Sequence, residues 1–201
     1  MKTNNKKKKL PTKGYKFFRT VLGPIFRFYY NPKIYNAEVI PKEGPIIIAG
    51  NHKHIMDQCS VIISTKRVVH YMAKKEYFDS KKTKWFFSVA GCIPVDRSIH
   101  DDNAKEAALQ VLEENGAIGI FPEGTRNKTK EFLLPFKFGC VSMAKKTNAT
   151  IVPFGIRGDY KFRSKNLQVH FGNPFKVDNM TLEEANQKLE KEIGNLMKKE
   201  N

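Results

Sequence analysis

Residues 45–57 read Pro-Ile-Ile-Ile-Ala-Gly-Asn-His-Lys-His-Ile-Met-Asp and contain the strongest fold signal in the chain. The run from Ile46 to Ala49 is apolar and rich in β-branched residues, which is typical of a strand buried on both faces. Gly50 ends the run, and a polar segment follows it directly. Strands of this kind occur mainly in parallel sheets that helices cover on both sides.

Strands and helices alternate along the rest of the chain. Further strands are predicted at residues 67–72, 92–95, 117–121, 150–156 and 167–171, and helices at residues 57–65, 80–90, 101–114, 138–147 and from 181 onward. The last helix is expected to open with a capping box, Thr181 to Glu184. This order predicts an α/β fold, with a single domain at residues 36–201 whose largely parallel central sheet is flanked by helices.

The positive charge of the chain is concentrated near its N-terminus. The sequence has 36 Lys and Arg against 20 Asp and Glu, a net charge of +16, yet residues 1–37 contain no acidic residue. Aromatic and aliphatic side chains lie among these charges at residues 15–30, which suits an anionic membrane surface. Two alternatives stay open: a Lys-rich tail followed by a helix that packs on the domain, and binding of nucleic acid. We expect the membrane surface as partner, and no nucleic acid.

This N-terminal segment is expected to lie on a membrane and not to cross it. A span needs about 20 mostly apolar residues, and the uncharged stretch between Arg19 and Arg27 has seven. The same arginines and the Gly23-Pro24 pair interrupt any apolar region of a secretory signal. We predict a flexible tail at residues 1–14 and then a basic, amphipathic segment up to residue 35. It would form one or two short helices, broken near Gly23-Pro24, at the cytoplasmic face of the cell membrane as a peripheral element.

The cysteines predict neither a disulfide framework nor a metal site. Cys59, Cys92 and Cys140 are isolated among apolar neighbours, and no two of them have the spacing of metal ligands. We expect buried, unreactive thiols.

His52 and Asp57 follow the first predicted strand and are candidates for acid–base chemistry. Their spacing of five is poor for contact within one helix, but it allows contact if His52 lies in the loop and Asp57 in the first helical turn. Asp57 would then accept a hydrogen bond from one ring nitrogen and leave the other to take a proton. A hydroxyl of the substrate would take the place of the serine in a protease triad. The alternative is that both residues only cap the helix.

A second polar segment, Phe-Pro-Glu-Gly-Thr-Arg at residues 121–126, follows the strand predicted at 117–121. Arg126 could bind a phosphate or carboxylate, and Gly124 lets backbone approach a ligand. Glu123 could pair with Arg126 or accept a hydrogen bond from a substrate hydroxyl. Because ligands bind beyond the carboxyl ends of parallel strands, the two polar segments are expected to face one crevice.

Two further segments complete a pattern of four. Residues 91–97 read Gly-Cys-Ile-Pro-Val-Asp-Arg, and residues 151–156 read Ile-Val-Pro-Phe-Gly-Ile. Together with residues 51–57 and 121–126, they resemble the four ordered blocks of the glycerophosphate acyltransferase family, most of all its 1-acylglycerol-3-phosphate (lysophosphatidic acid) acyltransferases. The resemblance covers roughly residues 45–157.

The resemblance implies a role for each matching residue. His52 would be the general base, and Asp57 would orient it. The glycerol phosphate would be held by Lys74 or Lys75, Arg97, Glu123, Gly124, Thr125 and Arg126. The implied reaction moves a fatty acyl group from acyl-carrier protein or acyl-CoA to the sn-2 hydroxyl of lysophosphatidic acid. Its product would be phosphatidic acid for phospholipid synthesis. No metal is expected, and no cofactor besides the acyl co-substrate.

One position departs from the family pattern, because His54 stands where the family usually has Ser. If that Ser only supports the loop, His54 can replace it. If it helps to hold substrate, the choice of acceptor could differ. This departure keeps open acyl transfer to another lysophospholipid. A separate alternative, from another class of function, is a lipid- or nucleic-acid-binding protein without catalysis.

Overall fold

The apolar run that opens the domain becomes strand β2 (Ile46–Gly50), in which every residue is buried. The computed structural model describes residues 12–96, 98–99 and 101–198. The other strands are β1 (Lys33–Tyr35), β3 (Val69–Lys74), β4 (Ile93–Val95), β5 (Ala117–Ile120), β6 (Thr150–Arg157) and β7 (Gln168–Phe171). They form one sheet in the order β1-β7-β6-β2-β5-β3-β4. All but the last three residues of the tail predicted to be flexible lie outside the described residues.

Helices separate most of these strands along the chain. They are α1 (Lys13–Tyr30), α2 (Asp57–Ile62), α3 (Lys81–Val89), α4 (Asp102–Glu113), α5 (Gly139–Thr147) and α6 (Leu182–Lys198), with short 3-10 helices η1 (Ala37–Val39) and η2 (Lys75–Phe78). Strands β6, β2, β5, β3 and β4 run parallel, whereas β7 is antiparallel to β6. The predicted α/β domain with a largely parallel sheet is therefore confirmed.

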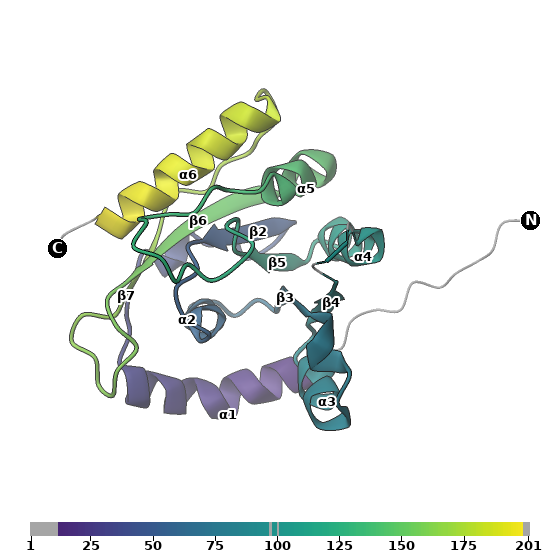
Figure 1. Cartoon of the computed structure of the whole chain (residues 1–201). Coiled ribbons are helices and arrows are strands. Elements are labelled where there is room, and N and C mark those ends of the chain that lie inside the picture. Colours follow the sequence, from purple (N-terminus) through teal and green to yellow (C-terminus); the bar gives the residue numbers. More distant parts are fainter. Residues whose placement is uncertain (1–11, 97, 100, 199–201) are drawn as a thin grey trace, which may run out of the picture.

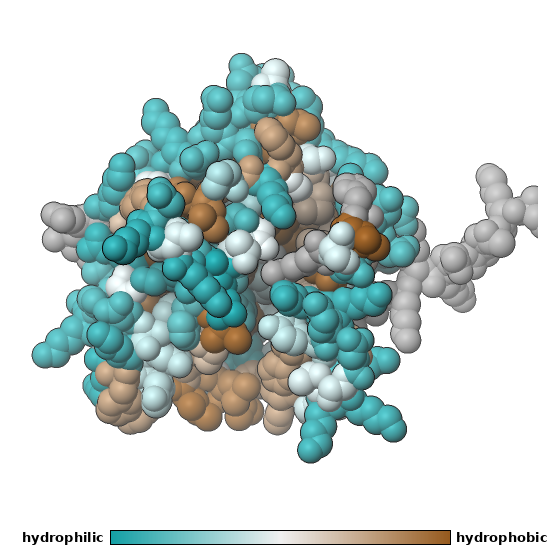
Figure 2. Space-filling view, in the orientation of Figure 1, coloured by the Kyte–Doolittle hydropathy of each residue, from teal (hydrophilic) through white to brown (hydrophobic). Residues whose placement is uncertain are grey.

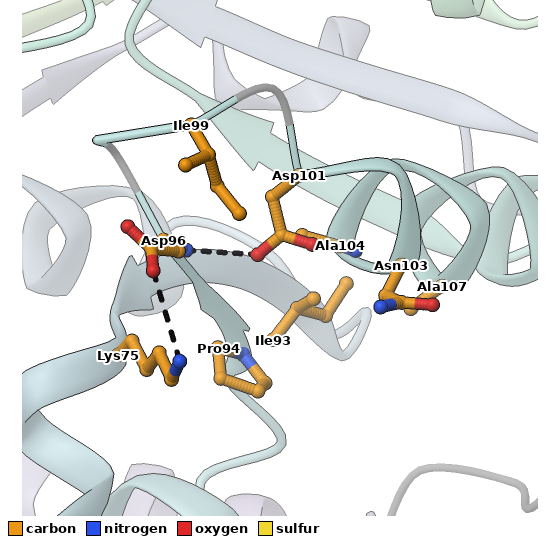
Figure 3. Close-up of a pocket in the computed structure, with 9 residues that line it drawn as sticks. All are labelled: Lys75, Ile93, Pro94, Asp96, Ile99, Asp101, Asn103, Ala104 and Ala107. Carbon is orange, nitrogen blue, oxygen red and sulfur yellow. Dashed lines mark hydrogen bonds and ion pairs between the residues drawn. The ribbon is translucent and has the colours of Figure 1, made fainter.

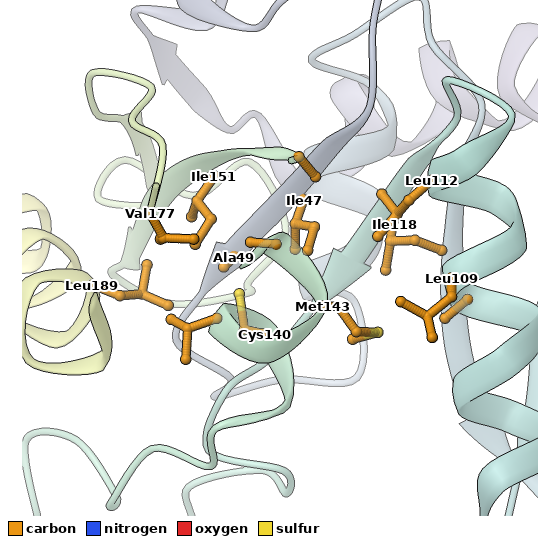
Figure 4. Close-up of a cluster of buried hydrophobic side chains, with 14 of the residues drawn as sticks. Ile47, Ala49, Leu109, Leu112, Ile118, Cys140, Met143, Ile151, Val177 and Leu189 are labelled. Carbon is orange, nitrogen blue, oxygen red and sulfur yellow. The ribbon is translucent and has the colours of Figure 1, made fainter. Parts of the chain in front are cut away.

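The sheet lies between two layers of helices (Figure 1). Ile47 and Ala49 of β2 belong to a core cluster with residues of α4, α5 and α6, whereas Ile46 and Ile48 belong to a second cluster that includes Val61 of α2. Figure 4 shows the first cluster, to which the helices contribute Leu109, Leu112, Cys140, Met143 and Leu189. Burial on both faces explains why β2 is apolar throughout instead of alternating.

Helix α1 is one continuous helix, so the predicted break near Gly23-Pro24 is wrong. A proline inside a helix removes one backbone hydrogen bond, and contacts with the domain hold the helix in spite of this loss. Tyr15 is buried, and the guanidinium groups of Arg19 and Arg27 donate hydrogen bonds to backbone carbonyls within residues 63–67. Within the described ranges, no helix combines the length and the apolar composition that a membrane crossing needs.

Strand β1 was not expected from the sequence. It pairs in parallel with β7, with Ile34 opposite Val169. The N-terminal segment predicted to end at residue 35 therefore contributes its last residues to the sheet. A strand of three residues is too short to show a period of two, which is why the sequence pattern does not reveal it.

Side-chain caps are present at the start of α4 and just before α6. The Asp101 carboxylate accepts a hydrogen bond from the Ala104 N–H at 3.0 Å. At α6, the Glu184 carboxylate accepts from the Thr181 N–H at 2.8 Å, and the Thr181 hydroxyl accepts from the Glu184 N–H at 3.1 Å. This reciprocal pair is the predicted capping box.

Candidate active site

The two polar segments leave adjacent strands at the same level of the sheet. Strands β2 and β5 are parallel neighbours, and Ala49 lies opposite Ile120 in their register. The loop at residues 51–56 and the turn at residues 121–126 therefore begin side by side, at the carboxyl ends of these two strands. The Asn127 N–H donates a hydrogen bond to the His52 carbonyl at 2.7 Å, which joins the two segments directly.

His52 and Asp57 are in contact. The His52 Nδ1 lies 2.9 Å from Asp57 Oδ2, with His52 in the loop after β2 and Asp57 as the first residue of α2. The Asp57 side chain is fully buried, whereas 15% of the His52 side chain is exposed. With Asp57 ionised, Nδ1 carries the proton and donates it, so Nε2 remains as a proton acceptor.

Asp57 also shapes the loop that carries His52. The same Oδ2 accepts hydrogen bonds from the backbone N–H groups of Lys53 and His54, each at 2.7 Å. The His52 ring stacks on Phe121, with centroids 3.9 Å apart and planes within 12°. One carboxylate and one aromatic face thus fix the position and the tilt of the imidazole.

Glu123 holds the backbone of His52 in place. Its side chain is buried, its Oε1 accepts from the His52 N–H at 2.8 Å, and its Oε2 accepts from the Leu134 N–H at 2.9 Å. Both oxygens are therefore bound to backbone groups of two other loops. The expected contact between Glu123 and substrate stays a prediction, and the geometry shown is that of a positioning residue.

Gly124 makes a tight turn that only glycine adopts easily. Its φ is +71°, and its N–H donates to the Phe121 carbonyl at 2.9 Å. Thr125 and Arg126 follow on the exposed side of this turn. In the described part of the chain, the Arg126 side chain makes no ion pair or hydrogen bond, so its charge is available to a ligand.

Lys137 is a basic residue of this region that sequence reasoning missed. Its N–H donates to the Pro122 carbonyl at 2.9 Å, and its side chain passes over Gly124. A Cβ placed on Gly124 would lie 3.1 Å from the Lys137 Nζ. Nothing in the local sequence marks this lysine as a ligand, because only the fold of residues 122–137 brings it back to the turn.

Lys74 and Lys75, which are also predicted phosphate ligands, lie farther along the same edge of the sheet. Lys74 ends β3, and Lys75 begins η2 beside a cavity of about 290 Å³ at the end of β4. Figure 3 shows this cavity, where the Lys75 Nζ lies 3.7 Å from Asp96 Oδ2 beside apolar side chains of the lining. Strand β3 separates β4 from β5, so the cavity is set apart from His52. Arg97 lies outside the described residues.

His54 supports the loop in the way that a serine could. Its Nδ1 accepts a hydrogen bond from the Met56 N–H at 3.3 Å, and its ring stacks on Tyr160 with centroids 4.4 Å apart. The Tyr160 hydroxyl lies 3.0 Å from the Ser60 Oγ. Burial raises the pKa of that hydroxyl, and the nearby Asp57 charge adds to the rise. These contacts favour the loop-supporting explanation of this departure.

His70 and the three cysteines have structural surroundings. The His70 Nδ1 lies 2.7 Å from the Gly91 carbonyl, and burial lowers the pKa of His70. Cys140 is buried as predicted, whereas Cys59 and Cys92 are half-buried. Burial raises the pKa of Cys59 to about 11 and that of Cys92 and Cys140 to about 12. Among the residues described, no group of three or more His, Cys, Asp or Glu side chains is arranged to hold a metal ion.

Known proteins share both this sequence pattern and this fold. The family profile called Acyltransferase matches residues 31–157. A 1-acyl-sn-glycerol-3-phosphate acyltransferase from Bacillus subtilis is 30% identical over 165 residues, which cover 80% of this chain and 81% of that protein. One from Borreliella burgdorferi is 36% identical over 138 residues, which cover 68% of this chain and 55% of that protein.

A solved structure shows the same architecture. The crystal structure of the 1-acyl-sn-glycerophosphate (LPA) acyltransferase PlsC from Thermotoga maritima superposes with a TM-score of 0.69 at 21% identity, covering 90% of this chain and 85% of that one. This likeness supports the fold. The profile match over more than half of the chain, together with the relative from Bacillus subtilis, shows that this chain belongs to the acyltransferase family.

Proposed function

We propose that this acyltransferase moves a fatty acyl group from a thioester donor, acyl-carrier protein or acyl-CoA, to the sn-2 hydroxyl of lysophosphatidic acid. The product would be phosphatidic acid for phospholipid synthesis. The observation that carries the proposal is the 2.9 Å contact between His52 and Asp57, which leaves Nε2 as a base beside the turn of Gly124 and Arg126. The names of the relatives from Bacillus subtilis and Borreliella burgdorferi support the choice of acceptor.

In the proposed step, His52 acts on the acceptor hydroxyl. Its Nε2 takes the proton as the hydroxyl oxygen attacks the thioester carbonyl carbon, and Asp57 stabilises the imidazolium that forms. The C–S bond then breaks, and the sulfur leaves as a thiolate that takes the proton back from the imidazolium. The products are an ester and a thiol. Since a thiolate leaves easily, a positioned base suffices in this scheme, and we propose no metal or further cofactor.

The acceptor phosphate is proposed to bind over the Gly124 turn. Arg126 is exposed there, and the Lys137 ammonium lies over the same glycine. Two cations without ion-pair partners among the described residues favour a dianionic headgroup. Lys74 or Lys75, Arg97 and Thr125 remain proposed contacts from the family pattern, and Glu123 is proposed to act by positioning His52.

The protein is also proposed to associate peripherally with an anionic membrane, at its cytoplasmic face. Helix α1 buries Tyr15 and Phe26 but exposes its opposite face, with Phe17, Val21, Leu22, Ile25 and Phe28 each at least 45% exposed. Figure 2 shows apolar residues gathered along the lower edge of the molecule, where Figure 1 places α1. Helices α1 and α3 also carry exposed lysines, namely Lys13, Lys16, Lys81, Lys82 and Lys84. Exposed rings among lysines favour lipid over nucleic acid as the partner.

Replacing His52 by Ala tests the catalytic proposal. We expect kcat/KM for acyl transfer to fall by about 10²- to 10⁴-fold, since the general base is lost, while binding to lipid vesicles stays unchanged. The measurement uses radiolabelled acyl-CoA and acyl-carrier protein as separate donors. His54→Ser is the matched control, because it restores the usual family residue and should keep activity. Normal turnover by the His52 variant would remove this residue from the mechanism.

Replacing Arg126 or Lys137 by Ala tests the phosphate proposal. Each variant should raise KM for lysophosphatidic acid roughly tenfold to a hundredfold, as expected for loss of a hydrogen bond to a charged group. Turnover of an uncharged monoacylglycerol should change little. Lys128→Ala, an exposed lysine on the next loop, serves as the control for net charge. An equal loss on both acceptors would contradict a role in binding phosphate.

A further inference from the structure

We propose that the β6–β7 loop (residues 158–167) is a second membrane-contact element, which places Phe162 in the interface of an anionic lipid bilayer beside α1. This inference rests on the proposed peripheral association with membranes. The sequence pattern placed that contact at residues 15–30, outside this loop. Figure 1 shows the loop hanging from the sheet next to the C-terminal end of α1.

Phe162 extends the apolar face of α1. Its side chain is 59% exposed, and its ring centroid lies 5.3 Å from that of Tyr29 and 6.5 Å from that of Phe28. Phe28 and Tyr29 are themselves 64% and 47% exposed. Three neighbouring rings from two separate segments therefore form one exposed aromatic surface.

Main-chain contacts fix the loop on the helix. The Arg163 N–H donates to the Tyr29 carbonyl at 2.6 Å, near the end of α1. Arg163 has a φ of +47°, a conformation that non-glycine residues adopt only when their surroundings require it. Its guanidinium lies 5.5 Å from the centroid of the Phe28 ring. Because backbone and side chain both hold Arg163, the position of Phe162 relative to α1 is set before any lipid binds.

The charges around Phe162 fit an anionic bilayer. Lys161, Arg163 and Lys165 are exposed and flank the ring. The acidic group of this loop is the Asp159 carboxylate. Its Oδ2 lies 3.6 Å from the Lys161 Nζ and accepts a hydrogen bond from the Asn166 Nδ2 at 3.2 Å. An aromatic ring at headgroup depth with basic side chains that reach lipid phosphates is the composition of interfacial membrane elements. We therefore assign an anionic lipid bilayer as the partner of this surface.

The inner side of the β6–β7 loop lies against the loop at residues 51–56, which carries His52. Tyr160 has its ring 5.4 Å from Tyr30 of α1 and 4.4 Å from His54, two residues after His52. Contact of Phe162 with the bilayer would therefore occur close to the candidate active site. A lysolipid acceptor would then have a short path from the membrane to His52.

A single-tryptophan experiment tests the inference. Trp85 is the one tryptophan of the sequence, so Trp85→Phe gives a background in which Phe162→Trp reports on the loop alone. Phe132→Trp in the same background is the matched control, because Phe132 is 48% exposed but packs near Gly194 of α6, in the layer opposite α1. The vesicles contain phosphatidylglycerol and phosphatidylcholine with brominated acyl chains, and co-sedimentation measures binding independently.

We expect the tryptophan emission of the Phe162→Trp variant to shift to shorter wavelength and to be quenched by the brominated lipids, and that of the Phe132→Trp variant to do neither. Phe162→Ala should weaken binding to the vesicles about tenfold, and Lys165→Gln about fivefold at low salt.

If the protein sediments with vesicles but the two tryptophan variants behave alike, the loop is not in contact with the bilayer, although docking through α1 stands. If no variant sediments with the vesicles, the membrane association fails and this inference with it. Equal binding to pure phosphatidylcholine would overturn the requirement for anionic lipid.

Discussion

At the level of single residues, two carboxylates build the candidate site through the backbone. Asp57 accepts two backbone N–H groups besides the His52 ring, and Glu123 accepts the N–H groups of His52 and Leu134. These hydrogen bonds hold the backbone of residues 52–54 and 134 in place around the imidazole. The candidate base His52 is therefore held in place in the free protein, which would lower the cost of organising it for each turnover.

His70 gives a pH dependence of stability. Burial lowers the pKa of this histidine, so the unfolded chain takes up its proton more readily than the folded one. The free energy of unfolding should therefore fall as pH drops below about 6.5 toward the lower pKa of the folded state. In urea unfolding between pH 7.5 and 5, His70→Gln should show a shallower loss of stability on acidification. Equal slopes for both proteins would show that the His70 proton is not involved.

The sequence predicts the contact between His52 and Asp57 better than the roles of the residues around it. A spacing of five across a strand–helix junction allows few geometries, and the structure adopts the expected one. Lys137 and Leu134 could not be found in this way, because their position depends on how residues 122–137 fold back. The supporting role of His54 depends likewise on Tyr160, more than a hundred residues later.

At the level of elements, two side-chain hydrogen bonds attach the loop at residues 51–56 to β6. The Asn51 Nδ2 donates to the Ile156 carbonyl at 2.9 Å, and the Ile156 N–H donates to the Asn51 Oδ1 at 2.7 Å. Asn51 is buried, and it lies one residue past the end of β2. The pairing of β2 with β6 ends at Gly50, and the Asn51 side chain continues it by bonding to the Ile156 backbone. The first residue of the loop is therefore fixed relative to β6.

Asn51→Ala should destabilise the domain by about 2–4 kcal/mol, because two buried backbone groups lose their partners. Denaturant unfolding measures the change, and kcat should fall as well, since His52 is the next residue. Glu106→Ala, on the exposed side of α4, serves as a control that should stay within about 0.5 kcal/mol of the parent. A loss below about 1 kcal/mol for Asn51→Ala would mean that water or a shifted strand satisfies Ile156.

Hydrophobic periodicity predicts most elements because burial dictates it. The strand at residues 46–50 and the helix at 102–113 were expected within a few residues of their actual ends. The continuity of α1 through Gly23-Pro24 was not, since contacts with residues 63–67 outweigh the local cost of the proline. Short elements such as β1 and the 3-10 helices leave no periodic signal.

At the level of the whole molecule, α1 has one face for the domain and another for the proposed membrane. Leu22 and Ile25 are 45% and 58% exposed, whereas Phe26 is 7% exposed. Deleting residues 1–35 would remove β1 and these core contacts, so it would test folding together with docking. Substitutions on the outer face separate the two.

Leu22→Glu and Ile25→Glu should weaken sedimentation with anionic vesicles without a lower thermal midpoint, since they place charge only on the exposed face. Phe26→Glu should lower the midpoint itself, because it buries an unpaired carboxylate. Phe132→Glu, on the side of α6, should affect neither vesicle binding nor the midpoint. Undiminished sedimentation of both outer-face variants would argue against α1 as a docking helix.

The two ends of the strand order have a consequence for how copies of the protein meet. Strands β1 and β4, the outermost in the sheet, have only three residues each. Pro94 interrupts the donors along β4, and the exposed charge of Lys33 begins β1. Neither border offers a long row of open amides on which another chain could extend the sheet. Crowding at a surface should therefore not drive fibril-like stacking of these domains.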